Sequence, residues 1–117
     1  LALERTDDPG LVSFNLAVAY LKQNQWTVAE SNFLRCLTDD AIPKDRRAKA
    51  LYNLGICIIK QNAKDLKRLR AAAECFELAR NESVALKLLD LSEDAADNLE
   101  IARKLWLNAL REKHQDT

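Results

Sequence analysis

The sequence predicts an all-α fold, and three observations support this prediction. The chain has only two glycines and two prolines among its 117 residues, which leaves little material for β-turns. Alanine, leucine, lysine, glutamate and arginine are abundant, and all of them favour helix. Apolar residues recur at helical spacing, and the pattern that begins at Asn15 starts again at Asn53 and, in part, at Asn98. The length is that of one domain with four or five helices.

The first predicted helical hairpin occupies residues 11–40. We expect its first helix to be capped by Asp8 and to end near Gln25, where polar residues interrupt the apolar periodicity. Ala17 and Ala29 are the small residues at which the two helices should come closest. The second helix of this hairpin carries a bulky stripe on one side: Trp26, Ala29, Phe33, Cys36 and Leu37.

The second predicted hairpin occupies residues 48–82. Gly55 stands at the close-approach position that Ala17 holds in the first hairpin. The repeat spacing places about five extra residues in the turn after Asn62, so this turn is expected to be enlarged. The second helix repeats the small–aromatic–small stripe of the first hairpin: Ala72, Phe76 and Ala79.

A last helix is predicted over residues 92–113, with Ser92 as its N-cap. The segment 83–91 either prolongs the preceding helix or forms a short helix of its own. We expect the last helix to cap the array, because one of its faces is an apolar stripe: Leu99, Ala102, Leu105, Trp106, Ala109 and Leu110.

These repeated positions resemble the consensus of the tetratricopeptide repeat (TPR) family, and the resemblance covers the chain from Leu11 to about Glu112. Ser13 and Leu51 depart from it, since the family often has tryptophan there. The resemblance implies a right-handed α-α superhelix of two divergent TPR hairpins with a C-terminal capping helix. The positions that carry it are Leu16, Ala17, Tyr20, Ala29, Phe33 and Cys36, then Leu54, Gly55, Ile58, Ala72, Phe76 and Ala79.

The same resemblance implies a protein–protein interaction module that binds a peptide or protein on its concave face. The alternative is a structural assembly module, whose apolar face packs against a second copy in a homodimer or against the rest of a larger protein. The first helix of each hairpin would line the concave face with ten residues: Phe14, Asn15, Val18, Leu21, Lys22, Tyr52, Asn53, Ile56, Ile59 and Lys60.

Catalysis, a cofactor and a metal site are not expected. The only histidine, His114, lies in a polar tail, and no phosphate-binding loop or metal-ligand spacing occurs. The three cysteines, Cys36, Cys57 and Cys75, occupy apolar or small positions of the repeat and are expected to be small buried hydrophobic residues. Their odd number and spacing argue against a disulfide framework and weakly favour the cytoplasm.

The net charge is zero, but residues 44–70 carry nine basic and two acidic side chains. This cluster either steers an acidic partner or neutralises neighbouring acids. Nucleic-acid binding is not expected, because the domain is not basic overall and no aromatic residues are interleaved with the cluster. The basic residues proposed for steering are Lys60, Lys64, Lys67, Arg68 and Arg70.

No apolar run approaches the roughly 20 residues that a membrane span needs, so this segment is not expected to insert into a bilayer. The last helix also resembles, more weakly, the TPR proteins encoded in bacterial MoxR and von Willebrand-factor-A gene clusters of the aerotolerance-operon type. That likeness implies a bacterial scaffold protein and leaves an association of a parent protein with the cell envelope open beside the cytoplasm.

Overall fold

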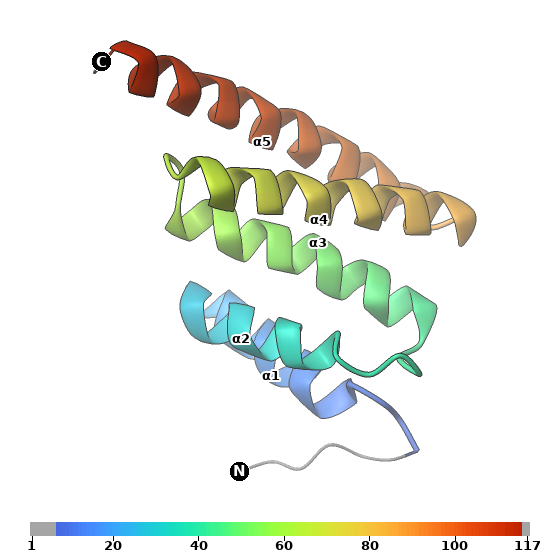
Figure 1. Ribbon diagram of the computed structural model, residues 1–117. Helices are drawn as coiled ribbons and strands as arrows, with labels where there is room; N and C mark the ends of the chain where they lie inside the picture. The colour runs from blue at the N-terminus through green and yellow to red at the C-terminus, as the bar shows by residue number, and fades with distance from the viewer. Residues whose placement is uncertain (1–6, 116–117) are drawn as a thin grey trace.

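The computed structural model describes residues 7–115, and within that range it contains α-helices and no β-strand. The all-α prediction is confirmed. Each helix packs mainly against its neighbours in the chain, so two helical hairpins stack on each other and the last helix lies over the second hairpin (Figure 1). The helices are α1 (Leu11–Lys22), α2 (Trp26–Cys36), α3 (Lys44–Gln61), α4 (Leu66–Ala85) and α5 (Leu89–Gln115).

The core is built from the two repeated stripes that the sequence indicates. Each stripe places an aromatic ring between two small residues, and a ring from the preceding helix meets it edge to face. The ring centroids of Phe14 and Phe33 are 6.0 Å apart, and those of Tyr52 and Phe76 are 5.7 Å apart. All six stripe residues are completely buried: Ala29, Phe33, Cys36, Ala72, Phe76 and Ala79.

Gly55 marks the closest approach of α3 to α4. A Cβ atom built on this residue would lie 2.7 Å from two atoms of the Phe76 ring. Only glycine leaves room for the ring at this distance, so the expectation of a close approach at Gly55 is confirmed. Ala17 and Ala29 are likewise completely buried in the first hairpin.

The start and end of α1 differ from the sequence expectation. The helix begins at Leu11 with Gly10 as its N-cap, and not directly after Asp8, because Gly10 adopts the left-handed region with φ 79°. The Asp8 carboxylate is used elsewhere, since it accepts a 2.6 Å hydrogen bond from the Arg46 guanidinium of α3. At the other end α1 stops at Lys22, and Asn24 in the turn has φ 59°.

The second hairpin is longer than the first, as expected, but most of the extra residues lie in its helices and the turn is enlarged by only one residue. The connection is three residues in the first hairpin, 23–25, and four in the second, 62–65. The extra residues mainly lengthen α4 at its N-terminal end, where Asp65 caps the helix by accepting a 3.1 Å hydrogen bond from the Arg68 amide.

The boundary between α4 and α5 also differs from the expectation. Helix α4 continues to Ala85, and α5 begins at Leu89 and runs to Gln115. Ser92 therefore lies inside the first turn of α5, and its hydroxyl donates a 2.8 Å hydrogen bond to the Leu89 carbonyl. The prediction that Ser92 caps this helix is wrong.

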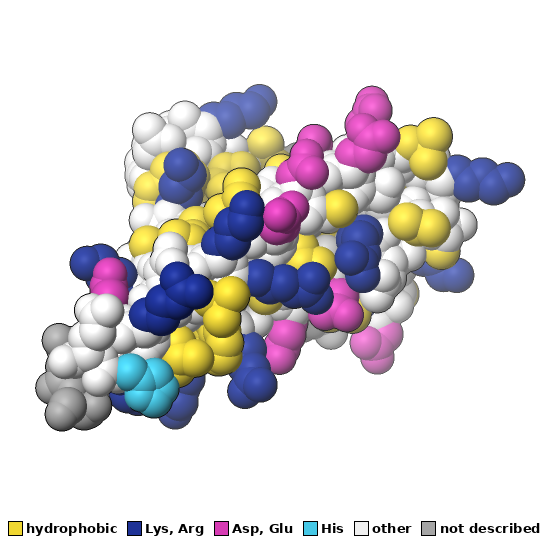
Figure 2. Space-filling view, turned by 90° about the horizontal axis from the view of Figure 1, so that it is seen from above, with side chains coloured by type: hydrophobic (Ala, Val, Ile, Leu, Met, Phe, Trp, Pro, Cys, Tyr) yellow, Lys and Arg dark blue, Asp and Glu magenta, His cyan; other side chains and the backbone are white. Residues whose placement is uncertain are grey.

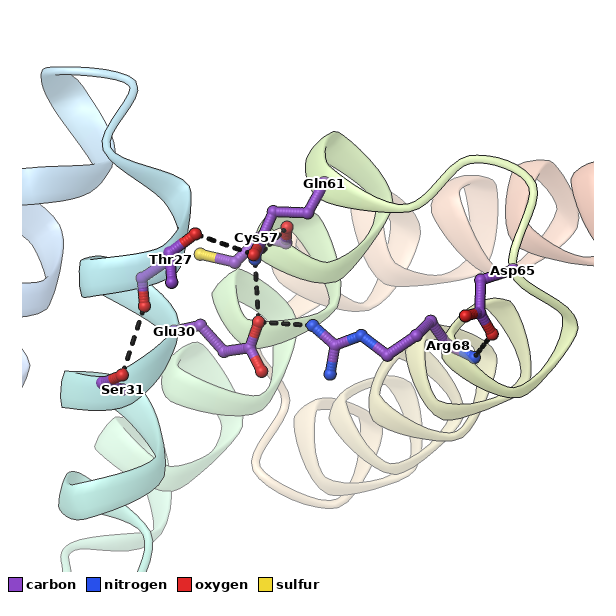
Figure 3. A network of polar contacts seen from close by, with 7 residues as sticks. All are labelled: Thr27, Glu30, Ser31, Cys57, Gln61, Asp65 and Arg68. Carbon is purple, nitrogen blue, oxygen red and sulfur yellow. Dashed lines mark hydrogen bonds and ion pairs between the residues drawn. The ribbon is translucent and has the colours of Figure 1, made fainter.

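A polar network joins α2, α3 and α4 near the C-terminal end of α3 (Figure 3). The Glu30 carboxylate of α2 accepts hydrogen bonds from Gln61 of α3, at 2.7 Å, and from the Arg68 guanidinium of α4. Gln61 also accepts a 2.9 Å hydrogen bond from the Thr27 hydroxyl. Burial raises the pKa of Glu30, but the bonds from Arg68 and Gln61 outweigh it and hold the pKa below its ordinary value. The network therefore fixes the two hairpins relative to each other.

The lowered pKa of Glu30 predicts how stability depends on pH. A carboxyl with a lowered folded-state pKa stabilises the fold fully above its unfolded pKa, and this contribution is lost as pH falls through the folded pKa. Glu30→Gln is therefore expected to cost about 2 kcal/mol near neutral pH. Urea unfolding in a pH series should show this cost shrinking below about pH 4.3, the ordinary value for glutamate.

Glu77→Gln is the matched control for this experiment. Glu77 is exposed on α4 and forms no ion pair within the described range. Its substitution should change the free energy of unfolding by less than about 0.5 kcal/mol at every pH. Equal effects of the two substitutions would contradict the structural role assigned to Glu30.

Candidate protein-binding face

The part of the predicted concave face on α1 consists of an apolar stripe with polar residues beside it. Phe14, Val18 and Leu21 follow each other at steps of four and three, so they share one side of the helix. They are half-buried and pack against the core with part of their surface. Asn15 and Lys22 are exposed. The stripe is thus held rigidly by the core but is not completely covered.

The part on α3 repeats this arrangement. Tyr52, Ile56 and Ile59 have the same spacing as the α1 stripe and are also half-buried against the core. Asn53 is half-buried, and Lys60 is exposed. The ammonium group of Lys60 lies 5.8 Å from the centroid of the Trp26 ring, so this lysine leans toward α2.

Residues of α1 and α3 line a shared hollow of about 150 Å³ at one end of this face. Phe14 and Asn15 contribute to it from α1. The hollow also contains charged residues that the sequence reasoning did not assign to the site. Arg46 is held there by its hydrogen bonds to Asp8 and to the Pro9 carbonyl. The charged lining residues come from the first turns of α3: Asp45, Arg46 and Lys49.

Helix α5 extends the face, which the sequence reasoning missed. The side-chain amide of Asn98 donates a 3.0 Å hydrogen bond to the Tyr52 hydroxyl. Burial raises the pKa of Tyr52, and the charges of Asp94 and Asp97 raise it further. The repeat register that pairs Asn53 with Asn98 also pairs Ile56 with Ile101, which is 48% exposed. This register was the signal that could have identified the α5 residues.

The predicted basic cluster does not remain intact in the structure. Arg68 turns to Glu30 and takes part in the internal network. The other four members, Lys60, Lys64, Lys67 and Arg70, are exposed. Arg68 is therefore a structural residue, and only the remaining cations can meet a partner.

The three cysteines are buried or half-buried, and the histidine is exposed. Cys36 and Cys57 are buried and Cys75 is half-buried. Burial raises the pKa of the Cys57 thiol to about 12 and that of Cys75 to about 11, so both stay protonated at neutral pH. His114 is exposed near the end of α5. Among residues 7–115 no group of three or more His, Cys, Asp or Glu side chains is placed to hold a metal ion.

No described helix has both the length and the apolar character that crossing a bilayer requires. No protein-family model, curated protein or solved structure matches the chain. The likeness to tetratricopeptide repeats therefore rests on the residues named above.

Proposed function

We propose that the chain is a non-catalytic protein–protein interaction module that binds a peptide or protein segment on the face formed by α1, α3 and α5. In this proposal the two hairpins are divergent TPR hairpins, α5 caps them, and the stack has a right-handed superhelical twist. The observation that supports it best is the repetition of one side-chain pattern on α1 and α3, the first helices of the two hairpins: an apolar stripe, partly exposed, beside an asparagine.

The half-buried stripes offer a partner apolar surface that it can cover. Each half-buried apolar side chain that a partner covers contributes roughly 25 cal/mol for every Å² of apolar surface removed from water. The side chains sit on helices fixed by the core, so little conformational entropy is lost on binding. Asn15 and Asn53 have no side-chain hydrogen bond within the described range. Each can therefore donate to and accept from the backbone of an extended peptide.

Selection from a random peptide library tests the proposal. Peptides selected on the wild-type chain are expected to bind the variant with Phe14→Glu and Ile56→Glu at least tenfold more weakly, which corresponds to about 1.4 kcal/mol. Two carboxylates in the apolar stripes would have to be desolvated on binding. Affinities measured by fluorescence anisotropy give the comparison.

The variant with Leu78→Glu and Val84→Glu is the matched control. These residues are 45% and 59% exposed on α4, so the same change of charge occurs on another surface. Circular dichroism establishes that both variants are folded. Selected peptides that bind all three proteins equally, or a wild-type chain that selects no peptide, would contradict the proposed function.

A further inference from the structure

Two hollows lie one helical turn apart between α4 and the C-terminal half of α5. The first has a volume of about 450 Å³ and opens at the α3–α4 turn, and the second has a volume of about 190 Å³. Residues from α4 and from α5, at least 30 positions apart in the sequence, meet in each of them. We call the two together the basic cleft, after the residues that characterise it: Lys64, Lys67, Arg70, Arg103, Trp106 and Lys113.

Four cations of the basic cleft form no ion pair with the described part of the chain, although two acidic residues, Asp65 and Glu112, also line its first hollow. These four cations are Lys67, Arg70, Arg103 and Lys113. Lys64 lies 3.9 Å from Glu112, but the two side chains are 81% and 56% exposed, and such a pair contributes little. Figure 2 views the molecule from the side of α5 and shows Lys and Arg side chains next to hydrophobic ones toward the C-terminal end of this helix.

The repeat register explains why Arg103 stays exposed. Leu51, Gly55 and Ile58 form the face of α3 that receives α4, and they are buried. The equivalent positions of α5, 45 residues later, are Ala96, Glu100 and Arg103. Glu100 and Arg103 are exposed and charged, which disfavours the packing of another helix there. Arg103 therefore remains accessible beside the half-buried Trp106.

We propose that the basic cleft is a second binding site, which takes an acidic peptide segment with an apolar side chain among its carboxylates. The guanidinium groups of Arg70 and Arg103 can each bind a carboxylate with two hydrogen bonds. Trp106 and Ala73 between them offer an apolar contact for the intervening side chain. The site is separate from the face of the proposed function and does not depend on it.

The surroundings favour an acidic peptide over a nucleic acid. Exposed carboxylates border the cations on both helices, with Glu74 and Glu77 on α4 and Asp97 and Glu100 on α5. They would repel a phosphate backbone that continued beyond the cleft, and the chain has no net positive charge to offset this repulsion. A short acidic segment needs only the cleft itself.

The fluorescence of Trp106 tests the proposal directly. Trp26→Phe leaves Trp106 as the only tryptophan, because the chain contains two. The probe is a peptide of glutamates around one leucine. Its titration is expected to change the Trp106 emission saturably, and added salt should weaken the binding. The same peptide with glutamine in place of glutamate should cause no change.

Two variants in this background identify the residues that bind. Arg70→Gln with Arg103→Gln is expected to weaken the binding at least tenfold. Arg35→Gln with Lys87→Gln removes the same charge from exposed positions outside the cleft and should leave the affinity unchanged. Phe14→Glu with Ile56→Glu should also leave it unchanged, which separates this test from that of the proposed function.

Three results would overturn the proposal. The first is an emission of Trp106 that does not respond to the glutamate peptide. The second is an equal loss of affinity in the Arg70/Arg103 and the Arg35/Lys87 variants, because the binding would then depend only on overall charge. The third is a single-stranded oligonucleotide that competes as well as the peptide at the same charge, which would assign the cleft to nucleic acid.

Discussion

Phe76→Ala is expected to destabilise the fold by about 4 kcal/mol. The ring is completely buried, contacts Tyr52 edge to face and fills the space that Gly55 leaves between α3 and α4. Removing it leaves a cavity between two long helices that their other contacts hold apart, so the site cannot collapse. Urea unfolding followed by circular dichroism measures the change in the free energy of unfolding.

Leu78→Ala on the same helix is the control for this change. Leu78 is 45% exposed, and its substitution is expected to cost less than about 1 kcal/mol. Both variants replace a large side chain of α4 by alanine, but only one loses a completely buried core contact. Similar costs for Phe76→Ala and Leu78→Ala would mean that the repeated stripe is not the core of the second hairpin.

Gly55→Val is expected to destabilise the fold by about 3 kcal/mol, although valine is a better helix former than glycine. Its Cβ would lie 2.7 Å from the Phe76 ring, so either the ring or α4 must move. Lys49→Val places the same residue at an exposed position of α3 and should cost less than about 1 kcal/mol. Urea unfolding of the two variants gives the comparison.

A smaller side chain at position 76 should relieve the overlap with Val at position 55. Combining Gly55→Val with Phe76→Leu is expected to cost less than the sum of the two single changes, by about 1 kcal/mol or more. Costs that add without coupling would show that the two side chains do not compete for the same space.

The sequence was sufficient to predict the parts of the fold that depend on repeated apolar spacing. The buried stripes around Phe33 and Phe76 and the close approach at Gly55 all follow from helical periodicity and from the comparison of one hairpin with the other. These features are determined locally, because a small residue is needed where two helices come closest. The ten residues assigned to the concave face lie on α1 and α3 as expected, and their role in binding stays a prediction.

The parts that the sequence did not predict depend on contacts between distant residues. Asp8 is a good helix cap by its chemistry, but Arg46, 38 positions later, takes its carboxylate. Arg68 belongs to the basic cluster by composition, but Glu30 withdraws it into the network between the hairpins. The basic cleft forms only because α5 folds back along α4 and places Arg103 near Arg70. Local patterns contain no information on such pairings.

Sedimentation equilibrium of the purified wild-type chain over a wide range of concentrations tests most directly whether the face of α1, α3 and α5 is free for a partner. We predict the monomer mass of 13.3 kDa at every concentration. The proposed function requires this, because only in a monomer are the half-buried stripes open to a peptide. A dimer that forms with rising concentration and dissociates in the variant with Phe14→Glu and Ile56→Glu would contradict this. It would show that a second copy of the chain already occupies the face, and that the chain serves assembly.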